Sequence, residues 1–301
     1  MKIRQFDSIT VDIPMRQSVR HALAERNVAR NILGAAHDEK GGVGWGECCP
    51  RPYVTGETID SVKQDLTTTI LPALLNIELG SFEQATELLV PQLDNIARNQ
   101  QAAFCAAELA VLDLAGRRFA TTAGMVLGPV QTPEVRYSGV IATDDIESVK
   151  QNAAFMAKFG VGDVKIKVGA SLESNLEILN TARAILGDGV TLRIDANCAW
   201  SATETIRQLT AMQAFSLTGV EQPVPAEDIE GMRTVTAAKL VPVVADESLC
   251  SLEDARTLID EQACDIFNVR ISKCGGLINA QRIDQLARAA GLACQLGAQV
   301  G

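Results

Sequence analysis

The sequence predicts an α/β protein in which a parallel sheet, curved toward a barrel, follows a smaller domain. Five apolar runs within residues 163–273 each end in a charged residue. These charges recur every 25 to 28 residues, at Lys167, Asp195, Glu221, Asp246 and Lys273. One strand, one helix and two short loops need about that length of chain. In a parallel barrel these side chains would therefore meet at the mouth formed by the carboxyl ends of the strands.

Composition places the chain among folded, enzyme-like proteins. It has 301 residues, of which 47% are hydrophobic, and a net charge of −10. A chain of this length can bury a large core and is expected to hold more than one domain. Its negative charge argues against a nucleic-acid partner, because binding phosphate needs a basic surface. No run reaches the ~18 apolar residues of a membrane span, and no signal-peptide core is present, so we expect a cytoplasmic protein without membrane contact.

Cysteine and histidine usage narrows the chemistry. The eight cysteines include no CxxC pair, and a chain of this size does not need disulfides, so we expect reduced, mostly buried thiols. The two histidines, His21 and His37, both lie near the amino terminus. A histidine-based zinc site, a Ser-His triad or a histidine general base is therefore not expected.

The first part of the chain predicts strands followed by helices. Apolar alternation over residues 2–47 gives way to helical spacing, and helices are expected over residues 59–75, 81–97 and 99–119. Pro129 and Pro133 mark a domain boundary. The predicted division is an α+β domain followed by a strand-helix domain, over residues 1–130 and 131–301.

Two irregular segments interrupt the strands of this first domain, over residues 16–27 and 48–58. Each is either a surface loop or a part of a substrate site. In the second case, the candidates for substrate contact are Arg20, Arg51 and Tyr53.

In the second domain, strands and helices alternate. A strand over residues 135–142 comes first, and helices are expected over residues 145–159, 171–186, 202–215, 227–238, 252–262 and 277–290. This pattern gives seven strands and six helices before Gly301. An unclosed barrel has open strand edges. We therefore expect the sequence to be a portion of a longer chain, with a damaged homologue as the alternative.

The three carboxylates Asp195, Glu221 and Asp246 end consecutive predicted strands. Carboxylates that are buried together repel, and a cation must offset this cost. Hard oxygen ligands favour Mg²⁺, with Mn²⁺ or Ca²⁺ as alternatives. A single carboxylate at the end of a strand would be interpreted as a solvated loop residue. Three carboxylates at the ends of consecutive strands, in register with the lysines, predict a metal site.

The lysines predict proton transfer. Lys165 and Lys167 are two apart on a strand, so they share a face and lie about 7 Å apart along it. Their like charges favour a lowered pKa in one of them, and Lys167, nearer the mouth, is the candidate base. Lys273 comes four strands later and would face Lys167, so the two amines could remove and return a proton on opposite faces of one carbon. Asn197, two residues past Asp195, either bonds a substrate oxygen or is a turn residue.

These residues resemble the enolase superfamily, in particular its muconate lactonising enzyme subgroup. The matching motifs are Lys165-x-Lys167, Asp195-Ala196-Asn197, Glu221-Gln222-Pro223, Asp246-Glu247-Ser248 and Lys273-Cys274-Gly275-Gly276. Residues 44–47 and 53–58 resemble the loop that closes over the site. The resemblance covers the whole chain. It implies a (β/α)7β-type modified TIM barrel, incomplete here with about seven strands, and an N-terminal α+β capping domain.

Two departures from family patterns are informative. The mandelate racemase subgroup would place a histidine on strand seven, where this chain has Cys294-Gln295-Leu296-Gly297. Lys273 therefore favours the muconate lactonising subgroup. Family members also continue into an eighth strand, whereas this sequence ends at Gly301.

The resemblance implies a function. Asp195, Glu221 and Asp246 would hold Mg²⁺, Lys167 and Lys273 would be the acid/base pair, and Lys165 would steady the charge of the substrate carboxylate and its enolate. The implied isomerase removes the proton α to a carboxylate. Within this chemistry we favour racemisation or epimerisation of a dipeptide or N-acyl amino acid. The alternatives are muconate-type cycloisomerisation and dehydration like that of o-succinylbenzoate synthase.

A candidate of another class is an inactive, incomplete barrel that only binds metal. The expected partners are a small carboxylate substrate and further copies of the same chain in a homo-oligomer.

Overall fold

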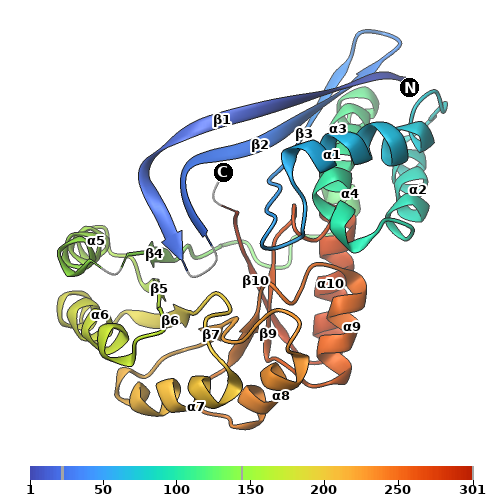
Figure 1. Ribbon diagram of the computed structural model, residues 1–301. Coiled ribbons are helices and arrows are strands. Elements are labelled where there is room, and N and C mark those ends of the chain that lie inside the picture. Colours follow the sequence, from blue (N-terminus) through green and yellow to red (C-terminus); the bar gives the residue numbers. More distant parts are fainter. Residues whose placement is uncertain (22–23, 144, 300–301) are drawn as a thin grey trace.

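The structure is a computed structural model that describes the backbone of residues 1–21, 24–143 and 145–299, and the side chains of these residues except 16–25. A three-stranded antiparallel sheet is followed by a seven-stranded parallel sheet whose strands lie in sequence order. Figure 1 shows the parallel strands curled into a half barrel, with helices outside it. A long hairpin of β1 (Ile3–His21) and β2 (Ala24–Asp38) arches over the half barrel. The predicted α/β class with an N-terminal α+β capping domain is confirmed.

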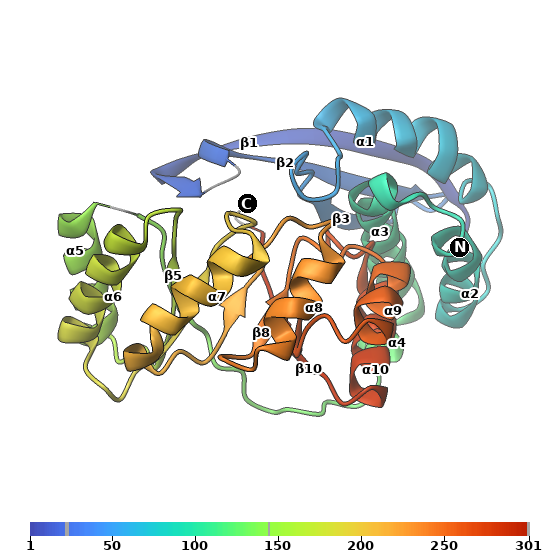
Figure 2. The same ribbon diagram turned by 60° about the horizontal axis from the view of Figure 1, so that its bottom comes forward.

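The half barrel repeats a strand and a helix. Its strands are β4 (Gly139–Ile141), β5 (Asp163–Lys167), β6 (Thr191–Asp195), β7 (Val220–Glu221), β8 (Val243–Ala245), β9 (Ile266–Val269) and β10 (Ala293–Leu296). Its helices are α5 (Ile146–Lys158), α6 (Leu172–Leu186), α7 (Ala202–Ala211), α8 (Ile229–Ala237), α9 (Leu252–Asp260) and α10 (Leu277–Ala289), with a 3₁₀ turn η4 (Gln213–Phe215) after α7. Figure 2 shows these helices along an arc outside the strands. Among the described helices, none is both long and apolar enough to cross a membrane.

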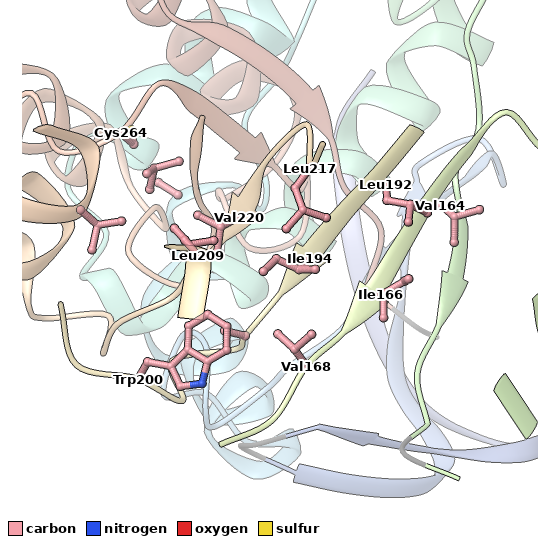
Figure 3. Close-up of a cluster of buried hydrophobic side chains, with 14 of the residues drawn as sticks. Val164, Ile166, Val168, Leu192, Ile194, Trp200, Leu209, Leu217, Val220 and Cys264 are labelled. Carbon is pink, nitrogen blue, oxygen red and sulfur yellow. The ribbon is translucent and has the colours of Figure 1, made fainter. Parts of the chain in front are cut away.

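Successive side chains of each strand point alternately to the helix-covered core and to the inner face of the half barrel. On β5, Val164 and Ile166 are buried against the helices. Figure 3 shows them beside Leu192 and Ile194 of β6. Because successive side chains point to opposite faces of a strand, Lys165 and the other odd-numbered residues of β5 point to the inner face.

The capping domain packs its sheet on one long helix. Strand β3 (Val43–Cys48) completes the sheet, and the helices are α1 (Ile59–Asp65), η1 (Leu66–Ile70), η2 (Leu71–Ala73), α2 (Phe82–Leu93), η3 (Arg98–Gln100), α3 (Gln101–Phe119) and α4 (Gly124–Leu127). Helix α3 is buried almost all round. A Cβ atom on Gly44 would lie 2.3 Å from the carbonyl oxygen of Ala110. Glycine therefore lets β3 lie directly on α3.

Two sequence expectations for the capping domain were wrong. The segment over residues 16–27 was expected to be irregular, but its described backbone extends the β1–β2 hairpin, with Val19 paired to Arg26. Backbone hydrogen bonds form a hairpin regardless of side-chain polarity, so composition gave no signal. The helix expected over residues 59–75 is divided into α1, a π-helical turn η1 and a 3₁₀ turn η2.

The division of the chain near residue 130 stays a prediction. Most of the buried apolar side chains fall into two clusters, one within residues 141–287 and one within residues 1–126. The second cluster also contains Ile278 of α10. The first turn of α10 is thus embedded in the capping domain.

A buried carboxyl group joins the two domains at this point. Glu108 of α3 is fully buried and accepts hydrogen bonds from the backbone amides of Leu277 (2.5 Å) and Ile278 (3.1 Å), at the start of α10. Burial raises the pKa of Glu108 to about 8, although the two amides act in the opposite direction.

This raised pKa predicts a pH-dependent stability. The unfolded chain ionises Glu108 near its ordinary pKa of 4.5 and the folded chain near 8. The free energy of unfolding should therefore fall as pH rises between these values, because only the unfolded state releases the proton. Urea unfolding of the native chain and of Glu108→Gln, measured from pH 4.5 to 8, checks this. The native chain should lose stability relative to the variant as pH rises, and a constant difference would contradict the raised pKa.

Candidate active site

The carboxyl ends of the parallel strands hold most of the charged residues singled out in the sequence. Asp195 is the last residue of β6, Glu221 is the last residue of β7, and Asp246 directly follows β8. Sheet register pairs Lys167 with Asp195 and Asp195 with Glu221. All three carboxylates are at most 1% exposed. Strand register therefore places Asp195 beside Glu221, and Asp246 continues the row two residues beyond Val244, the partner of Glu221 on β8.

Two lysines of β5 contact one end of this row. The Lys165 ammonium donates to Oδ2 of Asp195 at 3.0 Å and to Oε1 of Glu221 at 2.8 Å. The Lys167 ammonium donates to the same Oδ2 of Asp195 at 2.6 Å and to Oδ1 of Asn197 at 2.5 Å. Asn197 is buried and has a φ of +44°, so it occupies a turn and also belongs to the site.

Lys273 contacts the other end of the row. It lies in the turn after β9 and its side chain is fully buried. Its ammonium donates to Oδ1 of Asp246 at 2.8 Å, to the carbonyl oxygen of Asp246 at 2.6 Å and to that of Asn268 at 2.9 Å. Lys167 and Lys273 thus bracket the three carboxylates, with β6, β7 and β8 between their strands.

The charges shift the pKa values of several groups in different directions. Burial lowers the pKa of Lys273. Burial also acts to lower the pKa of Lys165, but Asp195 and Glu221 raise it overall. Burial acts to raise the pKa of Asp195, yet Lys165 and Lys167 hold it well below its usual range. Burial and then the charge of Asp195 raise the pKa of Glu247 to about 7.

The donor set suits a hard divalent cation, although the described side chains do not form a closed coordination sphere. Three buried carboxylates from adjacent strands supply oxygen ligands. Oδ2 of Asp246 is buried, and the guanidinium of Arg270 contacts this same oxygen. Within the described residues, no three acidic, histidine or cysteine side chains stand close enough together to hold a metal ion. The lysines and Arg270 hold the carboxylates instead.

A cavity of about 1560 Å³ lies beside this row. Lys165, Lys167 and Asn197 line it from the half barrel, and Arg51 and Tyr53 line it from the loop after β3. Side chains from the two domains therefore meet around one space large enough for a small substrate.

The predicted substrate residues of the capping domain differ in their surroundings. Arg51 is 4% exposed and donates to the carbonyl oxygens of Arg30 and Pro50 at 3.0 and 2.8 Å. Its guanidinium thus ties β2 to the loop after β3. The side chain of Arg20 lies outside the described residues. Substrate contact by Arg20, Arg51 and Tyr53 stays a prediction.

Three residues of the site were not assigned a role from the sequence. Asn268 of β9 and Gln295 of β10 donate to the two oxygens of Glu221, at 3.2 and 3.1 Å. Arg270, just after β9, contacts Asp246. A signal was available, because each is a polar residue within or next to a strand expected to be buried on both faces.

Removing Lys165 should destabilise the metal-free protein. Lys165→Met leaves Asp195 and Glu221 buried with less opposite charge, which should lower the free energy of unfolding by about 3 kcal/mol. Urea unfolding in a chelator measures this. The control is Lys150→Met, since Lys150 pairs with Glu147 on an exposed helix face and its loss should leave the unfolding midpoint unchanged. Equal midpoints for native chain and Lys165→Met would show that the pairs contribute nothing.

Comparisons of the sequence with known proteins find relatives that agree with one another in fold and in reaction type. Residues 147–301 match the family described as enolase C-terminal domain-like. The L-Ala-D/L-Glu epimerase of Clostridium acetobutylicum is 29% identical over 95% of this chain and 79% of its own. The hydrophobic dipeptide epimerase of Enterococcus faecalis is 29% identical over 99% of this chain and 82% of its own.

Solved structures agree with these relatives. The N-succinyl Arg/Lys racemase of Bacillus cereus has a TM-score of 0.93 at 26% identity, over 100% of this chain and 81% of its own. The dipeptide epimerase of Enterococcus faecalis, complexed with Mg and the dipeptide L-Leu-L-Tyr, has a TM-score of 0.89 at 28% identity, over 99% and 83%. The muconate lactonizing enzyme of Pseudomonas putida has a TM-score of 0.87 at 25% identity, over 99% and 80%. With its carboxylates and lysines at the carboxyl ends of a half barrel, this chain belongs to the enolase superfamily, in the subgroup of mandelate racemase and muconate lactonising enzymes.

Proposed function

We propose that this chain is a Mg²⁺-dependent isomerase that racemises or epimerises a dipeptide or an N-acyl amino acid. The observation that carries the proposal is the placement of Lys167 and Lys273 at opposite ends of a row of buried carboxylates. Two bases on opposite sides of a bound carbon are what inversion of its configuration requires. Relatives that are named dipeptide epimerases and an N-succinyl amino-acid racemase support this substrate class.

The chain's own residues supply the proton transfers. One lysine takes the α-proton as a free amine, and the electron pair of the broken C–H bond moves into the substrate carboxylate. The opposite lysine, as an ammonium, delivers its proton to the other face of the carbon. Lys167 and Lys273 exchange these roles in the reverse direction. Lys165, which donates to Asp195 and Glu221, would hold a cationic charge near the substrate carboxylate.

Asp195, Glu221 and Asp246 are the residues that would hold Mg²⁺. The oxygen ligands and their burial fit this ion. When bound, the ion supplies electrostatic stabilisation for the negative charge that develops on the substrate. Magnesium in the solved dipeptide epimerase of Enterococcus faecalis supports this assignment, and Mn²⁺ is the alternative ion.

The proposal extends to the setting of the enzyme. We propose two domains that divide near residue 130, assembly into a homo-oligomer and a cytoplasmic location. All eight cysteines are free thiols, which agrees with a reducing compartment.

Solvent deuterium exchange tests the reaction directly. The protein with Mg²⁺ in D₂O should place deuterium at the α-carbon of one substrate class and form its epimer, over a panel of L-Ala-L-Glu, hydrophobic dipeptides, N-succinyl amino acids and muconate. Lys167→Ala and Lys273→Ala should each slow epimer formation by about 10²-fold or more. Lys239→Ala is the control, because Lys239 is exposed and pairs with Asp265 away from the cavity. Lactone formation or dehydration instead of epimerisation would replace the proposed reaction with one of its alternatives.

Metal binding is measured separately from turnover. Mg²⁺ that binds the folded state alone should stabilise it, by about 2.7 kcal/mol at a hundredfold excess over the dissociation constant. Thermal unfolding with and without Mg²⁺ should show this gain in the native chain and not in Glu221→Gln. Asp284→Asn, which removes an exposed partner of Arg288, is the matched control and should keep the gain. Stabilisation without any exchange would favour the inactive metal-binding barrel.

A further inference from the structure

We propose that Glu108 is a positioning residue for Lys273: from the capping domain, it holds the turn that carries one of the two proton-transfer lysines. This inference rests on the proposed function, because it assigns Glu108 to one direction of the same reaction.

The barrel helices differ in how their first amides are satisfied. Helices α5 to α9 each begin with a residue whose side chain accepts a hydrogen bond from the first turn, namely Asp145, Ser171, Ser201, Asp228 and Ser251. Helix α10 begins after Gly276, which has no side chain to do so. The free amides of a helix start need a partner when they are buried. For α10 that partner is Glu108, 169 residues earlier in the chain.

The connection between Lys273 and α10 is short and pressed against α3. Gly275 and Gly276 have φ angles of +85° and +111°, in a region that favours glycine. A Cβ atom on Gly276 would lie 2.0 Å from Oε2 of Glu108, and one on Gly275 would lie 2.1 Å from Oε1 of Gln101. The backbone of this turn therefore lies directly on polar side chains of the capping domain.

Further contacts attach the same turn to the capping domain. Ser272, the residue before Lys273, accepts a hydrogen bond from the amide of Cys49 at 2.9 Å. The side chain of Ile278 is part of the capping domain's core, and Ile271 and Leu277 pack against that core. Lys273 is thus flanked on both sides by residues that the capping domain holds.

The two lysines depend on different supports. Lys167 lies on β5, within the hydrogen-bonded sheet between β4 and β6. Lys273 lies beyond the end of β9, so the turn and its anchors set the position of its backbone, while its ammonium is held by Asp246 and Asn268. A shift of about 1 Å in a catalytic group can cost about 10²-fold in rate. Loss of the Glu108 contact should therefore impair Lys273 and spare Lys167.

Glu108→Gln is the variant that tests this. It keeps the shape of the side chain, but its amide nitrogen donates hydrogen bonds and cannot accept one from α10. The readout is the rate of deuterium exchange at the α-carbon of each epimer, with Mg²⁺ present. The Lys167→Ala and Lys273→Ala variants identify the epimer whose α-proton faces each lysine.

Exchange should fall by about tenfold or more for the epimer that faces Lys273 and change by less than about threefold for the epimer that faces Lys167. The interconversion of the two epimers should slow as well, because it needs proton transfer by Lys273. Gly276→Ala places a Cβ atom against Glu108 and so disturbs the same contact from the turn. It should also slow exchange more for the epimer that faces Lys273 than for the epimer that faces Lys167. It also serves as the second variant if Glu108→Gln folds poorly.

A matched control is Glu57→Gln. Glu57 is also fully buried and accepts two helix-start amides, those of Ala102 and Ala103, both at 2.9 Å, but these belong to α3. Its replacement should change exchange of both epimers by the same factor. An equal loss for both epimers in Glu108→Gln and Gly276→Ala would overturn the positioning role and leave the proposed function intact.

A measurement without substrate tests whether Glu108 holds the start of α10. Amide hydrogen exchange over residues 273–280 should speed up in Glu108→Gln, while exchange over residues 252–260 in α9 should not. Unchanged protection would overturn the contact itself. A native chain that exchanges no substrate would overturn the proposed function and, with it, this role for Glu108.

Discussion

The burial of three carboxylates at one edge of the parallel sheet is the constraint on which the rest of the site depends. Asp195 and Glu221 end adjacent strands in register, and Asp246 directly follows the next strand, so the backbone places all three at one edge of the sheet whether or not their charges attract. Unpaired buried charges cost several kcal/mol each. The surrounding residues provide the compensation as ammonium, guanidinium and amide donors, from Lys165, Lys167, Lys273, Arg270, Asn268 and Gln295.

This compensation also provides the chemistry. The cations that neutralise the two ends of the row are the lysines that stand on opposite sides of a substrate in the proposed reaction. Their contacts are charge-assisted hydrogen bonds, which fix geometry as well as charge. Lys165 and Lys167, which stabilise the folded state, thereby already line the cavity, and Lys273 is fully buried at the other end of the row.

The capping domain has two roles in this arrangement. Its loop after β3 lines the cavity, and Arg51 ties that loop to β2. Its helix α3 reaches the start of α10 through Glu108 and packs around the turn that follows Lys273. A domain that would be described as a lid over the site therefore also supports one of the two lysines proposed to transfer protons.

Much of the fold could be predicted because its strands are buried on both faces. In β5 and β6, branched apolar residues alternate with Lys165, Lys167, Arg193 and Asp195. An apolar core excludes unpaired charges, so these charged side chains must share the inner face of the sheet, where they can pair. The hairpin end over residues 16–27 could not be predicted. Its hydrogen bonds join backbone atoms, and its sequence shows no alternation of apolar and polar residues.

By itself, the sequence determined the α/β class, the order of strands and helices, and the ends of the strands at which the metal-binding and proton-transfer candidates lie. These follow from local periodicity, which the chain carries in every window of a few residues. Only the tertiary structure decided that Asn268 and Gln295 hold Glu221, that Arg51 anchors a loop, and that Glu108 satisfies α10. Such contacts join residues that are far apart in the chain. Which residues meet depends on how the two domains pack, and the spacing of residues along the sequence does not indicate this.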